Sequence, residues 1–196
     1  MGLDIMVFRL QREFGPEKPE HKNNFYDYQL GPKGVEEFKV HGFEEFVKPT
    51  SCEYIDWKKT FEKFGIEWDE NRYINFGIGG EGYTFDDKEH PYTDEASYDD
   101  WVKHQLTFKW DDVVTYLEDT PTIYCEEIGY QRKGLYREDR KENFQDILTR
   151  HGYDYFVFDL RTLEEIRDHC ADDPDSFQKN IIDKYDPKDC VVAFDW

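Results

Sequence analysis

The sequence predicts an α+β fold, a single mixed domain over residues 1–196 with a central, mostly antiparallel sheet and four to five flanking helices. Short apolar runs that end at turn residues indicate strands, and apolar residues at helical spacing indicate helices between them. Strand-like runs at both ends of the chain suggest that the N- and C-terminal strands share the central sheet. A chain of this length can bury a core without disulfide bonds or metal ions.

The chain begins with two predicted strands. Residues 3–9 (LDIMVFR) are a short apolar run followed by a charged, turn-rich stretch, and residues 25–30 (FYDYQL) end at GPKG. The run at 3–9 is expected inside the sheet rather than in a loose tail. Residues 35–47 fit either a helix or a strand, because Gly42 interrupts both patterns.

The clearest helix signal covers residues 51–64. Thr50 and Glu53 match the T-x-x-E capping box, and Gly65 supplies the stop. Four aromatic residues fall at spacings of three and four on one helical face, namely Tyr54, Trp57, Phe61 and Phe64. This stripe predicts packing in the core.

A hairpin and an acidic stretch follow. Residues 72–78 and 83–85 are predicted strands joined by GGEG, and residues 86–100 form an acidic loop, the best candidate for a joint within the domain. Residues 104–110 alternate weakly, as a strand does. Residues 111–119 are predicted to be a short helix, because two aspartates at its start suit the positive end of the helix dipole.

The C-terminal third alternates strands and helices. Apolar runs predict strands at 122–130, 153–159 and 189–196. Helices are predicted at 138–151, at 162–170 and from Pro174 to Tyr185. The first has one-sided apolar spacing, the second opens with a capping box formed by Thr162 and Glu165, and the third has a proline at its start.

The composition is strongly acidic and aromatic. The chain has 45 acidic and 25 basic residues, a net charge of −20, with 16 Phe, 14 Tyr and five Trp. Such a charge repels nucleic-acid backbones and anionic membranes, so we expect no direct binding to either. It favours a protein partner with a basic surface, although solubility alone also accounts for it. The oligomeric state stays open.

Cysteine usage and the N-terminus predict a cytoplasmic protein. The widely spaced cysteines form no CxxC pair, which predicts separate, reduced thiols at Cys52, Cys125, Cys170 and Cys190. The opening MGLDIMVFRL lacks the basic start of a signal peptide, and no apolar run is long enough for a membrane helix. The six histidines form neither HxH nor HExxH, so we expect no zinc site and no cofactor.

The strongest non-random feature is a run of acids from Asp86 to Asp119, which holds eleven acidic residues against three lysines. Doublets of carboxylates can imitate successive phosphates, and neighbouring aromatic residues can anchor a protein partner. The candidate partner-binding residues are Asp86, Asp87, Asp94, Glu95, Tyr98, Asp99, Asp100, Trp101, Asp111 and Asp112. The alternative interpretation is a solvated loop with acids at a helix start. We expect internal or interface salt bridges, rather than a phosphate site, from the downstream cluster of Arg132, Lys133, Arg137, Arg140 and Lys141.

Two further patterns suggest chemistry. Asp4, Asp159 and Asp195 each flank an apolar strand run, and if they converged they could hold Mg²⁺ or Mn²⁺ in an enzyme acting on phosphate esters or nucleotides. In a chain with 45 acidic residues, three such aspartates are also expected by chance. The run GIGGEG at 77–82 lacks the Lys and Ser or Thr of a phosphate loop, which indicates a turn.

The first ten residues, Met1 to Leu10, resemble the start of small uncharacterised phage and prophage proteins, which open with MGLD and a short hydrophobic run. The resemblance implies a small viral protein in a bacterial cytosol, where acidic phage proteins often disable host defence or nucleic-acid-handling complexes. The leading hypothesis is therefore a non-enzymatic inhibitor whose carboxylate- and aromatic-rich surface imitates nucleic acid. A metal-dependent enzyme and a structural or assembly protein are the alternatives.

Overall fold

The computed structural model describes residues 3–13, 24–87, 105–135 and 138–195. These residues form nine strands and five α-helices around a central antiparallel sheet, which confirms the α+β class. The chain divides into two compact units: unit 1 comprises residues 1–50 and 119–196, and unit 2 comprises residues 51–118. The sequence suggested one domain with a joint at 86–100, whereas the division falls at 50/51 and at 118/119.

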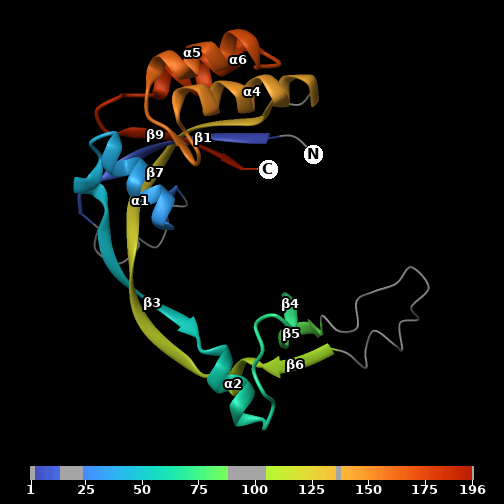
Figure 1. The fold of residues 1–196 in the computed structure, drawn as a ribbon. Helices are drawn as coiled ribbons and strands as arrows, with labels where there is room; N and C mark the ends of the chain where they lie inside the picture. Colours follow the sequence, from blue (N-terminus) through green and yellow to red (C-terminus); the bar gives the residue numbers. More distant parts are fainter. Residues whose placement is uncertain (1–2, 14–23, 88–104, 136–137, 196) are drawn as a thin grey trace. The chain divides into compact units, whose positions relative to one another are not determined.

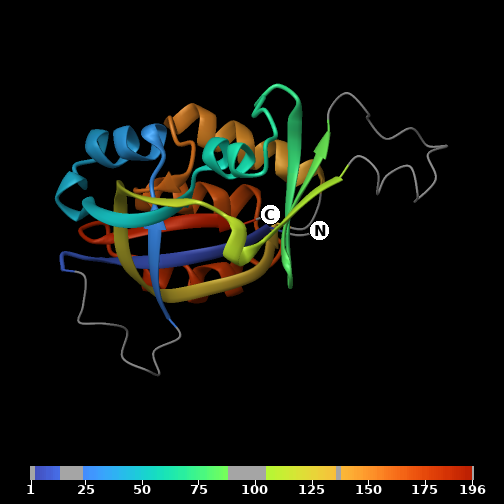
Figure 2. The ribbon, with the colours of Figure 1, turned by 90° about the horizontal axis from the view of Figure 1, so that it is seen from below.

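The sheet of unit 1 has the strand order β2-β7-β1-β9-β8, and neighbouring strands on this path are antiparallel. Its strands are β1 (Leu3–Gln11), β2 (Phe25–Gln29), β7 (Thr115–Leu135), β8 (Phe156–Val157) and β9 (Cys190–Asp195), and β3 (Lys48–Ile55) also pairs with β7. β1 and β9 lie side by side (Figure 2), with Met6 opposite Ala193. The expected meeting of the terminal strands in one sheet is confirmed.

Helices lie on both faces of this sheet (Figure 1). One face carries α4 (Glu138–His151), α5 (Leu160–His169) and α6 (Pro174–Asn180), and the other carries α1 (Pro32–Val40). The Phe144 ring of α4 lies 4.7 Å from the Phe194 ring, while the Phe38 ring of α1 lies 5.3 Å from the Phe156 ring. Because Phe156 pairs with Ala193, the neighbour of Phe194, the two contacts lie on opposite faces.

A buried carboxylate on α1 is hydrogen-bonded to the segment that leads into β8. Glu37 is 8% exposed, and its oxygens accept hydrogen bonds from the backbone N–H groups of Asp154, Tyr155 and Phe156 at 3.3, 3.1 and 3.4 Å. Burial raises the pKa of Glu37 more than these three donors lower it. The segment 153–159 forms a strand only at Phe156–Val157, and Glu37 supplies hydrogen-bond acceptors that a longer strand pairing would otherwise provide.

Unit 2 packs one helix on a small sheet. The antiparallel strands β4 (Tyr73–Gly79), β5 (Gly82–Asp87) and β6 (Gln105–Lys109) lie in this order, which confirms the predicted hairpin and the following strand. Phe61 of α2 (Trp57–Lys63) packs in a buried cluster with Phe85 and Phe108. Gly82 has a φ of 150°, and a Cβ there would lie 1.8 Å from the Phe108 carbonyl oxygen.

Two predicted helices are wrong in part, and in both places a strand takes over. The expected helix at 51–64 begins only at Trp57, after β3, and its cap is Asp56, whose carboxylate accepts from the Lys59 N–H at 3.0 Å. Residues 111–119 form the end of a 3₁₀ turn, η2 (Trp110–Asp112), and the start of β7. The helix at 138–151 is confirmed, and the later helices begin at Leu160 and at Pro174.

Candidate functional site

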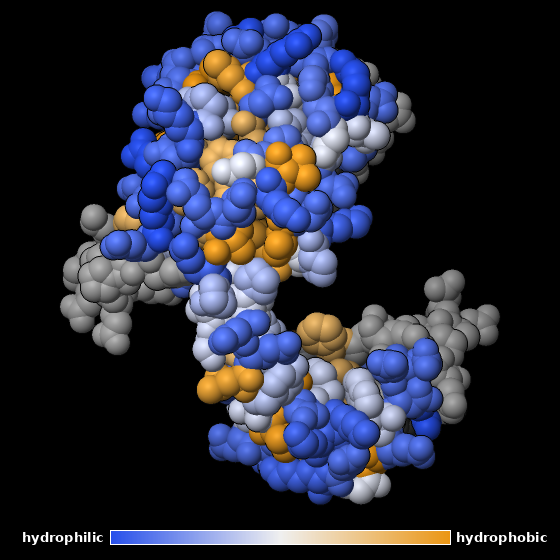
Figure 3. Space-filling model, turned by 60° about the vertical axis from the view of Figure 1, so that its left-hand side comes forward, coloured by the Kyte–Doolittle hydropathy of each residue, from blue (hydrophilic) through white to orange (hydrophobic). Residues whose placement is uncertain are grey.

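Acidic charge is concentrated in unit 2. Residues 51–118 hold 17 acidic and seven basic residues, so about a third of the chain carries −10 of the net −20. Much of the visible surface is hydrophilic, and hydrophobic side chains gather in small patches (Figure 3). The large hydrophobic side chains of unit 2 that stay exposed include Phe64, Phe76, Ile78, Trp110 and Leu117. Unit 2 therefore combines excess carboxylates with exposed apolar groups.

A hollow in unit 2 brings aromatic and acidic side chains together. Its volume is about 420 Å³, and we call it the acidic aromatic hollow. The end of β3 and the start of β7 form one part of its wall, while β5 and the turn η2 form the other. Its lining residues are Glu53, Tyr54, Ile55, Tyr83, Trp110, Asp111, Val113 and Thr115.

The aromatic wall of the hollow is held by ring packing. Trp110 is 46% exposed, and its ring meets the half-buried Tyr83 ring edge-on at 4.5 Å. The Tyr83 ring meets that of Trp57 at 5.2 Å, and Trp57 packs on the buried Phe85 at 4.4 Å. Each ring packs on the next, so the exposed Trp110 ring is supported by a chain of aromatic contacts that ends at the buried Phe85.

Two exposed carboxylates, those of Glu53 and Asp111, line the hollow. Within the described part of the chain, the side chains of Glu53 and Asp111 form no hydrogen bond or ion pair, and both are exposed. Two nearby lysines already have partners, because Lys59 pairs with Asp56 at 2.8 Å and Lys63 donates to the Asp112 carbonyl oxygen at 3.0 Å. The hydrogen bond from Lys59 holds the pKa of Asp56 below its usual range.

The structure places only part of the predicted partner-binding set. Asp111 lines the hollow, and Asp112 is its neighbour in η2. Asp86 lies on β5 and accepts from the Gln105 side chain at 3.4 Å. The side chain of Asp87 and the residues Asp94, Glu95, Tyr98, Asp99, Asp100 and Trp101 lie outside the described part.

Sequence reasoning missed most of the residues that line the hollow. Tyr54 was assigned to a helical core stripe, whereas it stands on β3. Glu53 was assigned to a helix cap and Tyr83 to a strand, and neither assignment pointed to a site, because only chain folding brings the two residues to Trp110. The doublet that follows Trp110 was the one usable clue. Of the basic cluster, Arg132 is described and exposed, while the side chains of Lys133, Arg137, Arg140 and Lys141 lie outside the described part.

The three strand-end aspartates do not converge. Asp4 and Asp195 are cross-strand neighbours. Asp159 follows β8, in which Val157 pairs with Val192, so it lies toward the Cys190 end of β9, about 17 Å along the strand from Asp195. Among the described residues no three His, Cys, Asp or Glu side chains are grouped to hold a metal ion. The convergence on which the metal-enzyme alternative depended is thus not found.

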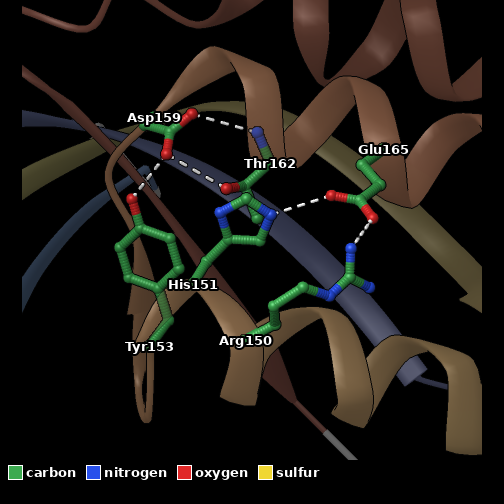
Figure 4. A network of polar contacts seen from close by, with 6 residues as sticks. All are labelled: Arg150, His151, Tyr153, Asp159, Thr162 and Glu165. Carbon is green, nitrogen blue, oxygen red and sulfur yellow. Dashed lines mark hydrogen bonds and ion pairs between the residues drawn. The ribbon is translucent and has the colours of Figure 1, made fainter.

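Asp159 instead belongs to a polar network between α4 and α5 (Figure 4). Its carboxylate caps α5 by accepting from the Thr162 N–H at 3.0 Å, and it also accepts from the Tyr153 hydroxyl at 2.9 Å. Burial raises the pKa of Asp159, but these hydrogen bonds outweigh it and hold the pKa below the usual value.

The other half of that network joins Glu165 of α5 to the end of α4. Glu165 contacts His151 at 2.8 Å and pairs with Arg150. The side chains thus engage one another, and the network anchors α4 to α5 rather than presenting free groups for catalysis.

The buried thiols do not suggest a nucleophile. None of the four cysteines forms a disulfide bond within the described part of the chain, and Cys125, Cys170 and Cys190 are buried. Burial raises the pKa of Cys125 and of Cys190 to about 12, so both stay protonated at neutral pH. The expected separate thiols are confirmed.

Comparison with known proteins gives no match to any family model, to any curated protein or to any solved structure. No helix in the described part of the chain is long and apolar enough to cross a membrane.

Proposed function

We propose that this chain is a non-enzymatic binding protein and that the acidic aromatic hollow of unit 2 receives a protein partner with a basic surface. The observation that carries the proposal is the meeting of Tyr54, Tyr83 and Trp110 with two exposed carboxylates, Glu53 and Asp111, in one hollow of about 420 Å³; neither carboxylate has a partner among the described residues. Tyr and Trp are the side chains that most often dominate binding energy at protein interfaces. Carboxylates at the rim speed the encounter with a basic partner and select against acidic ones.

The charge of unit 2 favours a partner that handles nucleic acid. A groove built for phosphates attracts a surface with a net charge of −10 in 68 residues, and the Asp111–Asp112 doublet resembles two successive phosphates. The resemblance of the N-terminus to phage proteins also favours a bacterial partner of this kind. Inhibition of a bacterial defence or nucleic-acid-handling complex is then the proposed role.

The first experiment is capture of partners from a bacterial lysate on three immobilised proteins. These are the wild type, the site variant Glu53→Gln/Asp111→Asn, and the control Glu164→Gln/Asp175→Asn, which removes the same two charges from exposed positions on α5 and α6. We expect one stoichiometric partner on the wild type and the control, lost from the site variant and weakened by salt. A partner that stays on the site variant, or that leaves both variants equally, would contradict the proposed site.

The second experiment measures affinity for the captured, purified partner by calorimetry. Trp110→Ala should weaken binding about 30-fold or more, the level of an interface hot spot. Leu117→Ala removes a side chain that is 70% exposed in the same unit and does not line the hollow, so its affinity should match the wild type. Equal effects of the two substitutions would remove the hollow from the interface.

A further inference from the structure

Unit 1 contains a second pocket, between its sheet and the start of α1. Its volume is about 460 Å³, within the usual range for small-molecule sites, and we call it the α1 pocket. β1 and β9 supply Met6 and Ala193 as its floor, the β2 end supplies Tyr28, and the β8 region supplies Tyr155 and Phe156. Gly31 and Gly34 of the α1 start line the remaining side.

The charge in this pocket is negative and concentrated at one end. Asp195 lines the pocket, and within the described residues its carboxylate has no hydrogen bond or ion pair. Asp4 stands opposite Asp195 on β1, and therefore on the same face of the sheet, with its carboxylate accepting from the Tyr130 hydroxyl at 2.8 Å. Like charges directly opposite each other on a sheet repel, and a bound cation would relieve that repulsion. No Lys or Arg lines the pocket among the described residues.

The opposite end of the pocket has the reverse polarity. α1 begins there, its N-cap Gly31 makes no side-chain cap, and helix N-termini carry partial positive charge. A positively charged group is therefore favoured beside Asp195 and disfavoured beside Gly31. Between the two ends the walls are mainly apolar, from Met6, Leu30 and Phe156.

We propose that the α1 pocket binds a small organic monocation, with its ammonium group at Asp195 and Tyr28 and its apolar body on Met6, Leu30 and Phe156. The electron-rich faces of aromatic rings attract ammonium groups, so Tyr28 and Tyr155 add to the attraction of the carboxylate. An anion of the same shape is repelled at Asp195. A diamine would place its second charge against the α1 N-terminus.

Calorimetric titration of the full chain with 2-phenylethylammonium tests the proposal, with phenylacetate as the ligand of similar shape and opposite charge. We expect saturable binding of the amine at one site and none of the acid. Asp195→Asn should weaken the amine about tenfold. Asp175→Asn, the same change on α6, should leave it unchanged. Circular dichroism verifies that both variants fold.

The remaining titrations test the part played by the Tyr28 ring and compare a small amine with a lysine side chain as the ligand. Tyr28→Phe keeps the ring and should keep most of the affinity, whereas Tyr28→Leu should lower it. Because a lysine side chain carries the same ammonium group, a capped lysine peptide is titrated too, and the apolar walls should make it the weaker ligand. Absence of saturable amine binding, equal binding of phenylacetate, an unchanged affinity in Asp195→Asn, or tighter binding of the lysine peptide would each overturn the proposal.

Discussion

Replacement of Glu37 by methionine should destabilise unit 1 measurably. Methionine keeps the length of the side chain and removes every acceptor, so the backbone N–H groups of Asp154, Tyr155 and Phe156 lose their partner. A hydrogen bond to a charged group contributes about 1.5–3 kcal/mol, but two of these three bonds are long and the carboxylate itself is buried at a cost. We therefore expect a loss of about 2–4 kcal/mol rather than the full sum of three bonds.

Urea unfolding followed by far-UV circular dichroism measures this loss, with Glu36→Gln as the control. Glu36 stands next to Glu37 on α1, but its side chain is 66% exposed, so its replacement should change stability by less than about 0.5 kcal/mol. The pKa of Glu37 is raised in the folded protein. Its contribution to the free energy of unfolding is therefore fully present below the pKa of the unfolded chain and falls as pH rises through the pKa of the folded protein. Equal stability of the two variants would refute the role of Glu37 as a clamp.

Three further predictions concern backbone, thiols and pH. Gly82→Ala should destabilise unit 2 by more than about 3 kcal/mol, because its Cβ would collide with the Phe108 carbonyl oxygen. The control Gly80→Ala places its Cβ in open space and should not cause such a loss. Tryptophan fluorescence measures the unfolding of this unit, which holds four of the five tryptophans. In the native protein an aromatic disulfide reagent should modify Cys52 first, and rapid release of all four thiols before unfolding would contradict the buried positions of the others. Burial lowers the pKa of His41 in the folded protein. Its contribution to stability is therefore complete above the pKa of the unfolded chain and is lost as pH falls through the pKa of the folded protein. His41→Phe should remove this contribution to acid sensitivity, which thermal melts at a series of pH values measure.

The outline of the fold is predictable from the sequence where local pattern and tertiary packing agree. The helix at 138–151 has a one-sided apolar face, and the terminal strands are continuous apolar runs, so both appear as expected. The signal at Thr50 and Glu53 failed because the same residues suit a strand, and pairing with β7 decided between the two. Local propensity is a weak prior when a long strand offers a continuous ladder of hydrogen bonds.

The candidate site was predictable only in its chemistry. Acidic doublets pointed to Asp111, which lines the hollow, but the predicted set did not include its neighbour Trp110, which lines the hollow as well. Tyr83 and Glu53 reach the same place through the β5–β6 pairing and through β3, which no spacing in the sequence encodes. Glu37 gave no signal at all, because one glutamate in an ambiguous segment looks the same whether buried or exposed.

The route of the chain through β3 and β7 bears on how such a protein can diversify. Unit 2 is one uninterrupted stretch of sequence, and it leaves and re-enters unit 1 through two strands that pair with each other. A gene segment for residues 56–114, which lies between these two strands, can therefore be exchanged as a cassette while β3 and β7 keep their ladder. Replacing it by a short turn would leave β3 and β7 as a closed hairpin. Recombination at the two ends of this segment would replace most of unit 2 and leave the scaffold of unit 1, with its α1 pocket, untouched.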